Sequence, residues 1–157
     1  MSLALRNLLF TLVVPGAGAV WIPWWILTNS GPTAPVAPYA VAVIGVGIAL
    51  YLWCLSLFAA VGRGTPGPWD APRRVVAVGP YRWVRNPIYL AALTVVSGEA
   101  WLFMSLPLLA YAGAMAITVH LFVIGYEEPT LERRFGATYT AYRQSVPRWL
   151  PRPPRRN

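Results

Sequence analysis

Residues 88–126, IYLAALTVVSGEAWLFMSLPLLAYAGAMAITVHLFVIGY, decide the fold, because these 39 positions contain a single charged residue, Glu99. A membrane helix needs about 20 apolar residues to cross a hydrocarbon core of about 30 Å. The stretch is therefore too long for one span, and Ser105-Leu106-Pro107 interrupts it. The pattern predicts two membrane helices, at about 88–104 and 107–126, joined by a tight turn.

The rest of the sequence supports a membrane protein. Of its 157 residues, 57% are hydrophobic and 11% are charged, whereas soluble domains carry about 25% charged residues. Two further apolar runs, 8–28 and 39–61, bring the expected number of transmembrane helices to four. The length fits one all-α domain over residues 1–157 and leaves no room for a complete doubly wound nucleotide-binding domain.

The distribution of charge predicts the orientation. The 13 basic residues are all arginines, against five acids. One is Arg6 near the N-terminus, and the others lie in the loop 62–87 and in the tail 127–157. Because cytoplasmic segments carry the excess of arginine, we expect both termini, the loop and the tail to be cytoplasmic. Charge that flanks apolar runs indicates a membrane and not a nucleic acid as the partner. The use of arginine alone suggests a GC-rich, bacterial genome and hence the bacterial cytoplasmic membrane.

Two cytoplasmic segments are expected to be ordered. The loop 62–87 is rich in glycine and proline and is expected to form a cap. After Pro129, apolar residues recur at spacings of three or four on the side opposite three arginines, which predicts an amphipathic helix lying at the interface; the apolar residues are Leu131, Phe135, Tyr139, Tyr142 and Val146. Arg143 and Arg148 either attract an anionic headgroup or anchor the tail to the anionic leaflet.

Two polar clusters stand at the cytoplasmic ends of the last two predicted spans. In the first, Pro87 suits the first turn of a helix with Asn86 as its cap, so that Arg85 and backbone N–H groups could hold an anion; the alternative is an interfacial anchor. The second is Glu127-Glu128. Carboxylates are unfavourable at a helix C-terminus, so we expect a positive partner, either loop arginines or a cationic ligand.

Three isolated features have two interpretations each. Gly45 and Gly47 in the second span either pack against a neighbouring helix or form part of a site. His120 precedes Glu127 by two helical turns and is either a ligand contact or a hydrogen-bonded packing residue. Glu99 is expected to be structural, near the 105–107 turn, although a transporter could use it as a coupling carboxylate. One histidine and one cysteine, Cys54, make neither a metal cluster nor a disulfide.

Three motifs in order resemble those of a known superfamily. They are Gly79-Pro80-Tyr81-Arg82-x-x-Arg85-Asn86-Pro87-x-Tyr89, then Tyr126-Glu127-Glu128-Pro129-x-Leu131, then Phe135-Gly136-x-x-Tyr139-x-x-Tyr142-x-x-x-Val146-Pro147. Over about residues 40–150 the chain resembles the isoprenylcysteine carboxyl methyltransferases and phospholipid N-methyltransferases, which are integral membrane enzymes that use S-adenosylmethionine. Asn86 stands where the isoprenylcysteine enzymes have histidine, whereas Asn-Pro-x-Tyr occurs among the phospholipid enzymes.

The resemblance implies a set of cofactor-binding residues. The phospholipid enzymes contribute Gly45, Gly47, Glu127 and Glu128 to this set, and the isoprenylcysteine enzymes contribute Arg85, Asn86, Pro87 and Tyr89. His120 is added because of its position relative to Glu127. Glu128 and Arg85 are expected to be catalytic, and no metal is expected.

The implied function is S-adenosylmethionine-dependent methyl transfer at the cytoplasmic membrane face. The acceptor would be a lipid or another lipophilic or small molecule, which the sequence does not identify, and the oligomeric state stays open. His120, Glu128 or a tyrosine could take a proton from an amine acceptor. Two other classes remain: a small four-helix transporter that uses Glu99, and a sterol-reductase-like enzyme that uses NADPH.

Overall fold

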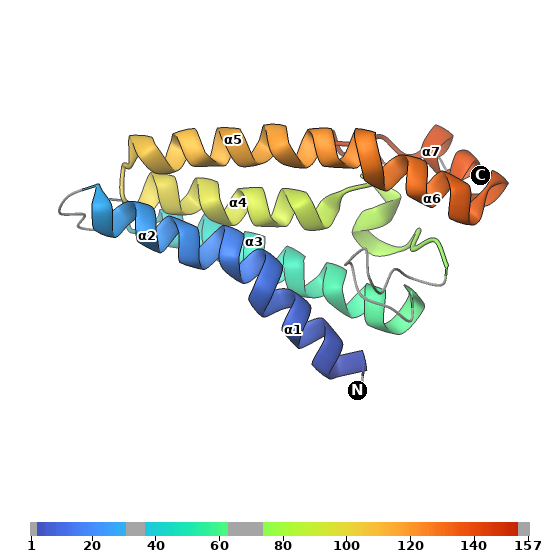
Figure 1. Ribbon diagram of the computed structural model, residues 1–157, viewed down its shortest axis with the longest axis horizontal. Helices are drawn as coiled ribbons and strands as arrows, with labels where there is room; N and C mark the ends of the chain where they lie inside the picture. The colour runs from blue at the N-terminus through green and yellow to red at the C-terminus, as the bar shows by residue number, and fades with distance from the viewer. Residues whose placement is uncertain (1–2, 31–36, 63–73, 154–157) are drawn as a thin grey trace.

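The computed structural model describes residues 3–30, 37–62 and 74–153, and every regular element in these ranges is helical (Figure 1). Two long helices are interrupted by a π-helical turn, which adds one residue to a helical turn, and the described part of a third ends in one. The elements are α1 (Leu3–Gly16), a π-turn (Ala17–Trp21) and α2 (Ile22–Asn29); α3 (Ala40–Leu57) and a π-turn (Phe58–Gly62); a 3₁₀-helix (Gly79–Arg82); α4 (Pro87–Leu102); α5 (Leu106–Phe122), a π-turn (Val123–Glu127) and α6 (Glu128–Phe135); and α7 (Ala137–Ser145).

Three continuous helices are long and apolar enough to cross a membrane: Leu5–Asn29, Ala40–Gly62 and Leu106–Phe135. The fourth apolar helix, α4, has 16 residues, which is about 24 Å at about 1.5 Å per residue. Large apolar side chains such as Leu12, Val13 and Ile117 are exposed along these helices. Such a surface is suited to lipid. Together with the absence of strands from the described residues, these helices confirm the expectation of an all-helical protein with membrane-like helices.

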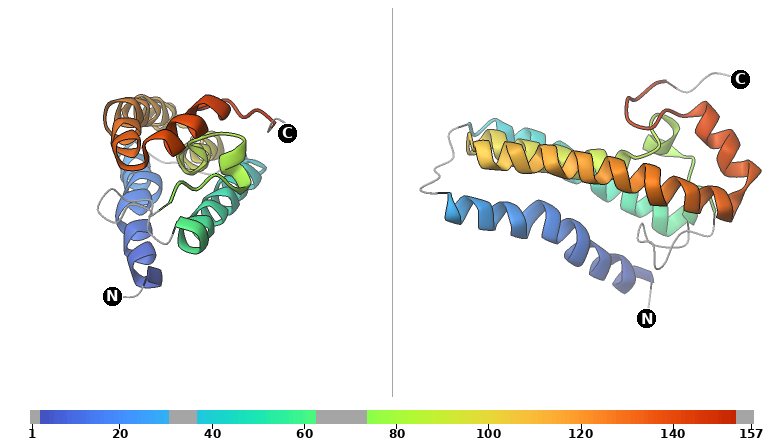
Figure 2. Two further views of the ribbon diagram at one scale, coloured as in Figure 1. Left: turned by 90° about the vertical axis from the view of Figure 1, so that its right-hand side faces the viewer. Right: turned by 45° about the horizontal axis from the view of Figure 1, so that its top comes forward.

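Helix α4 lies between α3 and α5 in the bundle (Figures 1 and 2). Its contact with α3 depends on two glycines. A Cβ atom on Gly47 would stand 2.8 Å from Cγ2 of Val95, and one on Gly98 would stand 2.7 Å from Cγ1 of Ile44. These distances are too short for a side chain, so the glycines let the two helices approach closely, as small residues do in membrane bundles.

The predicted turn between the last two apolar helices is present. Helix α4 ends at Leu102 and not at the predicted residue 104, and α5 begins at Leu106. Ser105 is the N-cap of α5, and its hydroxyl oxygen accepts a hydrogen bond from the backbone N–H of Leu108 at 3.4 Å. The carbonyl of Leu102 also accepts a hydrogen bond from the N–H of Ala37 at 3.2 Å, which ties this turn to the start of α3.

The helix predicted to end at Tyr126 continues to Phe135. Glu127 and Glu128 therefore lie within a helix, and the argument that carboxylates are unfavourable at a helix C-terminus does not apply to them. Pro129 does not break the helix because it stands in the first turn of α6, directly after a π-turn, where its missing N–H costs little. The prediction of a single amphipathic helix after Pro129 is also wrong, since Gly136, with φ +52°, separates α6 from α7.

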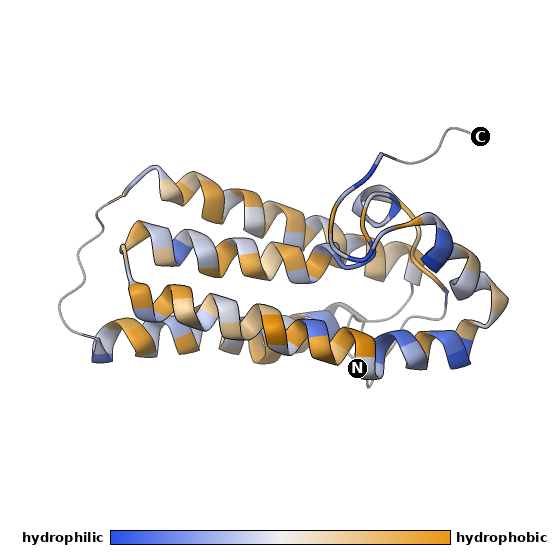
Figure 3. Cartoon of the chain, turned by 90° about the horizontal axis from the view of Figure 1, so that it is seen from above, coloured by the Kyte–Doolittle hydropathy of each residue, from blue (hydrophilic) through white to orange (hydrophobic). Residues whose placement is uncertain are grey.

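One end of the bundle is polar. Figure 3 shows hydrophilic residues gathered over α6, α7 and the last described residues. The first turn of α1 and the C-terminal residues both lie towards this end (Figures 1 and 2). Of the loop expected to form a cap, residues 63–73 lie outside the described residues, and residues 74–86 run beside the ends of α3 and α4. The fold thus brings the sequence-distant polar segments together at one end.

Candidate functional site

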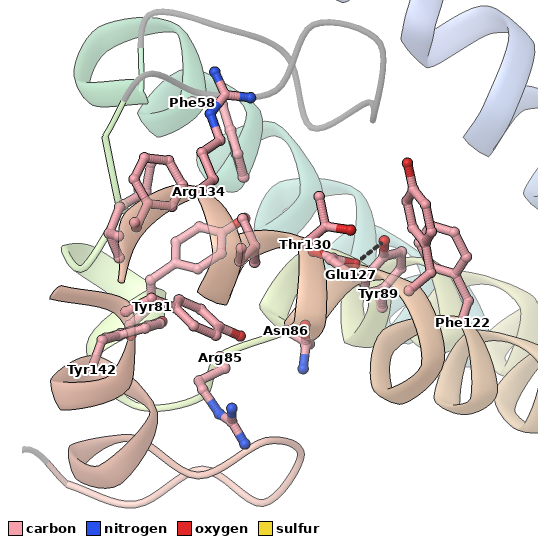
Figure 4. Close-up of a pocket in the computed structure, with 16 residues that line it drawn as sticks. Phe58, Tyr81, Arg85, Asn86, Tyr89, Phe122, Glu127, Thr130, Arg134 and Tyr142 are labelled. Atoms are coloured by element: carbon pink, nitrogen blue, oxygen red, sulfur yellow. Dashed lines mark hydrogen bonds between the residues drawn. The ribbon is translucent and has the colours of Figure 1, made fainter. Parts of the chain in front are cut away.

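A pocket lies at the polar end, between the π-turn after α3, the segment 75–89, the end of α5, α6 and α7 (Figure 4). Its volume is about 140 Å³, roughly ten times the 10–15 Å³ that a single water needs. The sixteen lining residues are Phe58, Val75, Val76, Tyr81, Arg85, Asn86, Tyr89, Phe122, Tyr126, Glu127, Thr130, Leu131, Arg134, Phe135, Tyr139 and Tyr142. The pocket is therefore large enough for part of an organic ligand.

Half of the lining residues are aromatic. The rings of Phe58 and Tyr81 meet edge to face, with centroids 5.6 Å apart and an interplanar angle of 81°. The rings of Phe122 and Tyr126 lie 5.3 Å apart at 32°. Aromatic faces carry partial negative charge and attract cations within about 6 Å. The walls are thus suited to a flat, apolar or positively charged group.

One wall carries a carboxylate, that of Glu127. The hydroxyl of Tyr89, on α4, donates a hydrogen bond to Oε2 of Glu127 at 2.6 Å (Figure 4). Hydrogen bonds to an ionised acceptor are short and stronger than neutral ones. This contact orients the carboxylate and joins α4 to the π-turn that precedes α6.

Glu128 has a different environment from its neighbour and does not line the pocket. Its side chain is buried, with Nη1 of Arg85 at 2.9 Å from Oε1. Arg148 binds both carboxylate oxygens, with Nε 2.7 Å from Oε1 and Nη2 2.9 Å from Oε2. The hydrogen bond to Glu128 raises the pKa of Arg148. The positive partners expected for the glutamate pair are therefore present at Glu128.

Arg85 forms the second charged part of the pocket wall. Its side chain is 8% exposed, and Nε is buried without a hydrogen-bond partner. Figure 4 shows Arg85 and Asn86 pointing away from the Tyr89–Glu127 pair. Arg85 lines the pocket, and a guanidinium is suited to an anionic or carbonyl group of a ligand.

The C-terminal segment crosses this part of the site. The backbone N–H of Arg85 donates to the carbonyl of Pro147 at 2.8 Å, and the N–H of Arg152 donates to the carbonyl of Trp83 at 3.0 Å. Asn86 occupies the N-cap position of α4 but makes no side-chain cap. The prediction that its side chain caps the helix is therefore wrong; the described contact of this side chain is the hydrogen bond that Nδ2 donates to the carbonyl of Arg148 at 3.1 Å.

Helix α7 closes another side of the pocket. The hydroxyl of Tyr142 donates to the backbone carbonyl of Tyr81 at 2.8 Å. Burial is the main cause that raises the pKa of Tyr142, so its hydroxyl stays protonated and keeps this bond at neutral pH. Gly136 allows the turn that brings α7 back over the pocket, since its φ of +52° is in a region that favours glycine.

The structure brings together part of the predicted site. Arg85, Asn86, Tyr89 and Glu127 line the pocket. Pro87 is buried at the start of α4, directly next to these residues. His120 does not line the pocket; its Nδ1 accepts a hydrogen bond from Nε1 of Trp149 at 3.0 Å. This contact corresponds to the packing interpretation of His120.

The remaining singled-out residues lie outside the pocket. Gly47 is packed against α4, and a Cβ on Gly45 would meet nothing within 4 Å; their cofactor-binding role stays a prediction. Glu99 is in the last turn of α4, at the end opposite to the pocket, and its Oε2 is buried without a hydrogen-bond partner. Among the described residues, no group of three or more histidines, cysteines or acids could hold a metal.

Sequence reasoning missed most of the aromatic wall. The sequence predicts Tyr139 and Tyr142 on the apolar face of an interfacial helix, whereas in the structure they line the pocket. Phe58 and Phe122 belong to apolar runs that gave no sign of a site. The available signal was the recurrence of tyrosine and phenylalanine within the same motifs that carry Arg85 and Glu127.

Comparison with known proteins identifies a family. The model of a family described as phospholipid methyltransferase matches residues 38–138. This range covers more than half of the chain and includes α3, α4, α5, α6 and the charged parts of the pocket wall. No curated protein and no solved structure matches the chain.

Proposed function

The chain belongs to the phospholipid methyltransferase family, and from this premise we propose that it transfers a methyl group from S-adenosylmethionine to a lipophilic or small acceptor. The observation that carries the proposal is the aromatic pocket with a carboxylate, Glu127, on one wall and a guanidinium, that of Arg85, on another. Both residues lie in the part of the chain that the family matches.

The residues of the pocket fit the groups of S-adenosylmethionine. This molecule carries a sulfonium, an ammonium, a carboxylate and an adenosine. Glu127 is suited to the ammonium or to ribose hydroxyls, and Arg85 is suited to the carboxylate. The aromatic walls are suited to the sulfonium and the adenine ring.

When bound, S-adenosylmethionine supplies a methyl carbon on a positively charged sulfur, and transfer breaks that C–S bond while the acceptor's lone pair forms the new bond. The chain contributes positioning, which can supply about 7–11 kcal/mol of the barrier. Its aromatic walls exclude water and stabilise positive charge. For an amine acceptor, we assign the role of proton acceptor to Glu127 in place of Glu128, because Glu127 is the carboxylate on the pocket wall.

The acceptor side of the pocket opens towards the apolar surface of the bundle. Phe122 is 39% exposed and Tyr126 is 47% exposed, and both also line the pocket. They lie on the helix Leu106–Phe135, whose surface is apolar enough for lipid. An acceptor with an apolar chain can therefore reach the pocket from the bilayer, which supports a lipophilic substrate.

The proposed topology has four spans, with α4 as the fourth, and places the pocket on the cytoplasmic side. Support comes from the charges, since all arginines of the described residues lie in α1's second turn or in the segments at the pocket end; they are Arg6, Arg74, Arg82, Arg85, Arg133, Arg134, Arg143, Arg148 and Arg152. Cytoplasmic segments carry such an excess.

The test is ligand-induced stabilisation of the purified protein in detergent. S-adenosylhomocysteine at 100 times its Kd should stabilise the fold by about 2.7 kcal/mol and raise Tm. The Glu99→Gln variant should respond as the parent does, because Glu99 lies at the opposite end from the pocket. A rise in Tm with NADPH and none with S-adenosylhomocysteine would contradict the proposal. Radiolabelled methyl transfer to fractionated lipid extracts would then identify the acceptor.

A further inference from the structure

The two neighbouring glutamates differ in what they contact. Glu127 is on the pocket wall and is bound by a neutral hydroxyl, that of Tyr89. Glu128 is 5% exposed and lies off the pocket. Both of its oxygens already interact with guanidinium nitrogens of Arg85 and Arg148. A buried carboxylate with its oxygens occupied in this way has little capacity left for a ligand.

Residues 146–152, which we call the clasp, follow α7 and pass over the start of α4. The clasp is fixed by backbone bonds to Arg85 and Trp83 and by the side chain of Asn86. Its Trp149 reaches α5 through the hydrogen bond to His120. The clasp thus joins α4, α5 and α6 next to the pocket, and Arg148 is its ionic contact with α6.

The charges of this group depend on one another. Arg85 and Arg148 are both cationic, and Glu128 lies between them, 2.9 Å from Arg85 and 2.7 Å from Arg148. Without the carboxylate, the buried guanidinium of Arg85 would face that of Arg148, which is 33% exposed, and two like charges at this distance are unfavourable. Without Arg148, the carboxylate would lose its bidentate partner and would no longer be held in one position relative to Arg85.

From these contacts we infer that Glu127 alone of the pair contacts the ligand, whereas Glu128 and Arg148 are positioning residues that hold Arg85 at the pocket wall. The clasp is therefore a structural part of the ligand site, although it is remote from it in sequence. The binding test of this inference rests on the proposed function. A second measurement, made without ligand, tests the inference independently of that function.

The binding test uses the Kd for S-adenosylhomocysteine of the full chain in detergent. Arg148→Gln and Glu128→Gln should each weaken binding about tenfold, or about 1.4 kcal/mol. In an Arg85→Gln background the same changes should have little further effect, because they act through Arg85. Glu127→Gln should weaken binding in both backgrounds. Arg148→Lys, which keeps the charge but loses the bidentate geometry, should retain part of the affinity.

The matched control is Arg143→Gln. Arg143 pairs with Glu132 at 3.0 Å, but both side chains are exposed, so its removal should leave Kd unchanged. Equal weakening by Arg148→Gln or Glu128→Gln in the parent and in the Arg85→Gln background would overturn the inference.

The second measurement is Tm without ligand for Glu128→Gln, Arg148→Gln and the double variant. Coupled residues give non-additive losses, so the double variant should lose clearly less than the sum of the single losses. Additive losses would overturn the inference. If the parent protein does not bind S-adenosylhomocysteine at all, the proposed function fails. The comparison of Tm among the two single variants and the double variant then decides alone whether Glu128 and Arg148 act as a unit.

Discussion

At the residue level, the hydroxyl of Tyr89 controls the carboxylate of the pocket. We expect Tyr89→Phe to lower the free energy of unfolding by about 1–3 kcal/mol, because a partly buried carboxylate loses its donor. The affinity for S-adenosylhomocysteine should fall about tenfold, since Glu127 is no longer oriented. Thermal unfolding in detergent and ligand titration measure the two effects.

Tyr39→Phe is the control for this prediction. Tyr39 also lies at the end of an apolar helix, and its ring centroid is 5.2 Å from that of Trp101. It lies, however, at the end of the bundle away from the pocket. Its hydroxyl should be dispensable for binding. Equal affinities for the Tyr89→Phe variant and the parent would show that Tyr89 does not orient Glu127.

At the same level, the sequence predicted the charged residues of the pocket better than its aromatic residues. Arg85, Asn86, Tyr89 and Glu127 are polar groups next to apolar runs, where their cost makes them conspicuous. Tyr139 and Tyr142 follow helical spacing, and periodicity shows that a face is apolar without showing what covers it. The pairing of Glu128 with Arg148 was not predictable either, because it joins residues that only the folded tail brings together.

At the level of helices, two glycines in α3 have opposite surroundings. Gly47→Ala should destabilise the bundle by about 1–3 kcal/mol, because the added Cβ would stand 2.8 Å from Val95 and overpack the contact with α4. Gly45→Ala should change stability by less than about 0.5 kcal/mol, since nothing lies within 4 Å of the added atom. Thermal unfolding followed by tryptophan fluorescence separates the two variants.

The same pair tests the role that the family resemblance gives to these glycines. Neither lines the pocket, so Gly45→Ala should bind S-adenosylhomocysteine as tightly as the parent. Weaker binding by Gly45→Ala with an unchanged Tm would mean that the ligand reaches α3.

A second prediction for the helices concerns the break between α6 and α7. Gly136 has φ +52° and ψ −130°, a conformation that costs other residues about 1–3 kcal/mol. Gly136→Ala should therefore lower Tm and weaken ligand binding, because α7 carries Tyr139 and Tyr142 to the pocket. Gly125→Ala is the matched control, since a Cβ there also meets nothing within 4 Å and no positive φ is involved. Similar losses for both variants would rule out backbone strain as the cause.

Helix positions were predictable from hydropathy, whereas one helix end was not. The expected runs coincide with Leu5–Asn29, Ala40–Gly62 and the start of α5 within a few residues, because apolar length is set by the membrane. The extension to Phe135 was missed because Pro129 normally ends a helix. The π-turn Val123–Glu127 removes that restriction, and nothing in the local sequence identifies a π-turn.

At the level of the whole molecule, the charged residues of the described ranges are collected at one end, with the exception of Glu99 at the opposite end of α4. The long apolar helices present lipid-compatible surfaces, and the segments between and after them form the pocket end, where the buried Glu128 pairs with Arg85 and Arg148. The burial of Glu128 is possible because its charge has two guanidinium partners. The site is thus built from loop, helix end and tail around a membrane bundle, without a sheet in the described residues.

The same distribution predicts the topology, which cysteine labelling can test in a Cys54→Ala background. Ser145→Cys lies in α7 at the arginine-rich end and should react with a membrane-impermeant maleimide only after cells are permeabilised. Met104→Cys, at a residue 66% exposed in the turn before α5, and Thr28→Cys, near the end of α2, should react in intact cells. The reverse pattern would contradict the orientation. The hydrogen bond from Ala37 to Leu102 places the turn after α4 at the end of the bundle opposite to the pocket. If α4 spans the membrane, Met104→Cys should therefore react in intact cells as Thr28→Cys does. A reaction of Thr28→Cys alone, with Met104→Cys and Ser145→Cys both protected, would contradict α4 as a span.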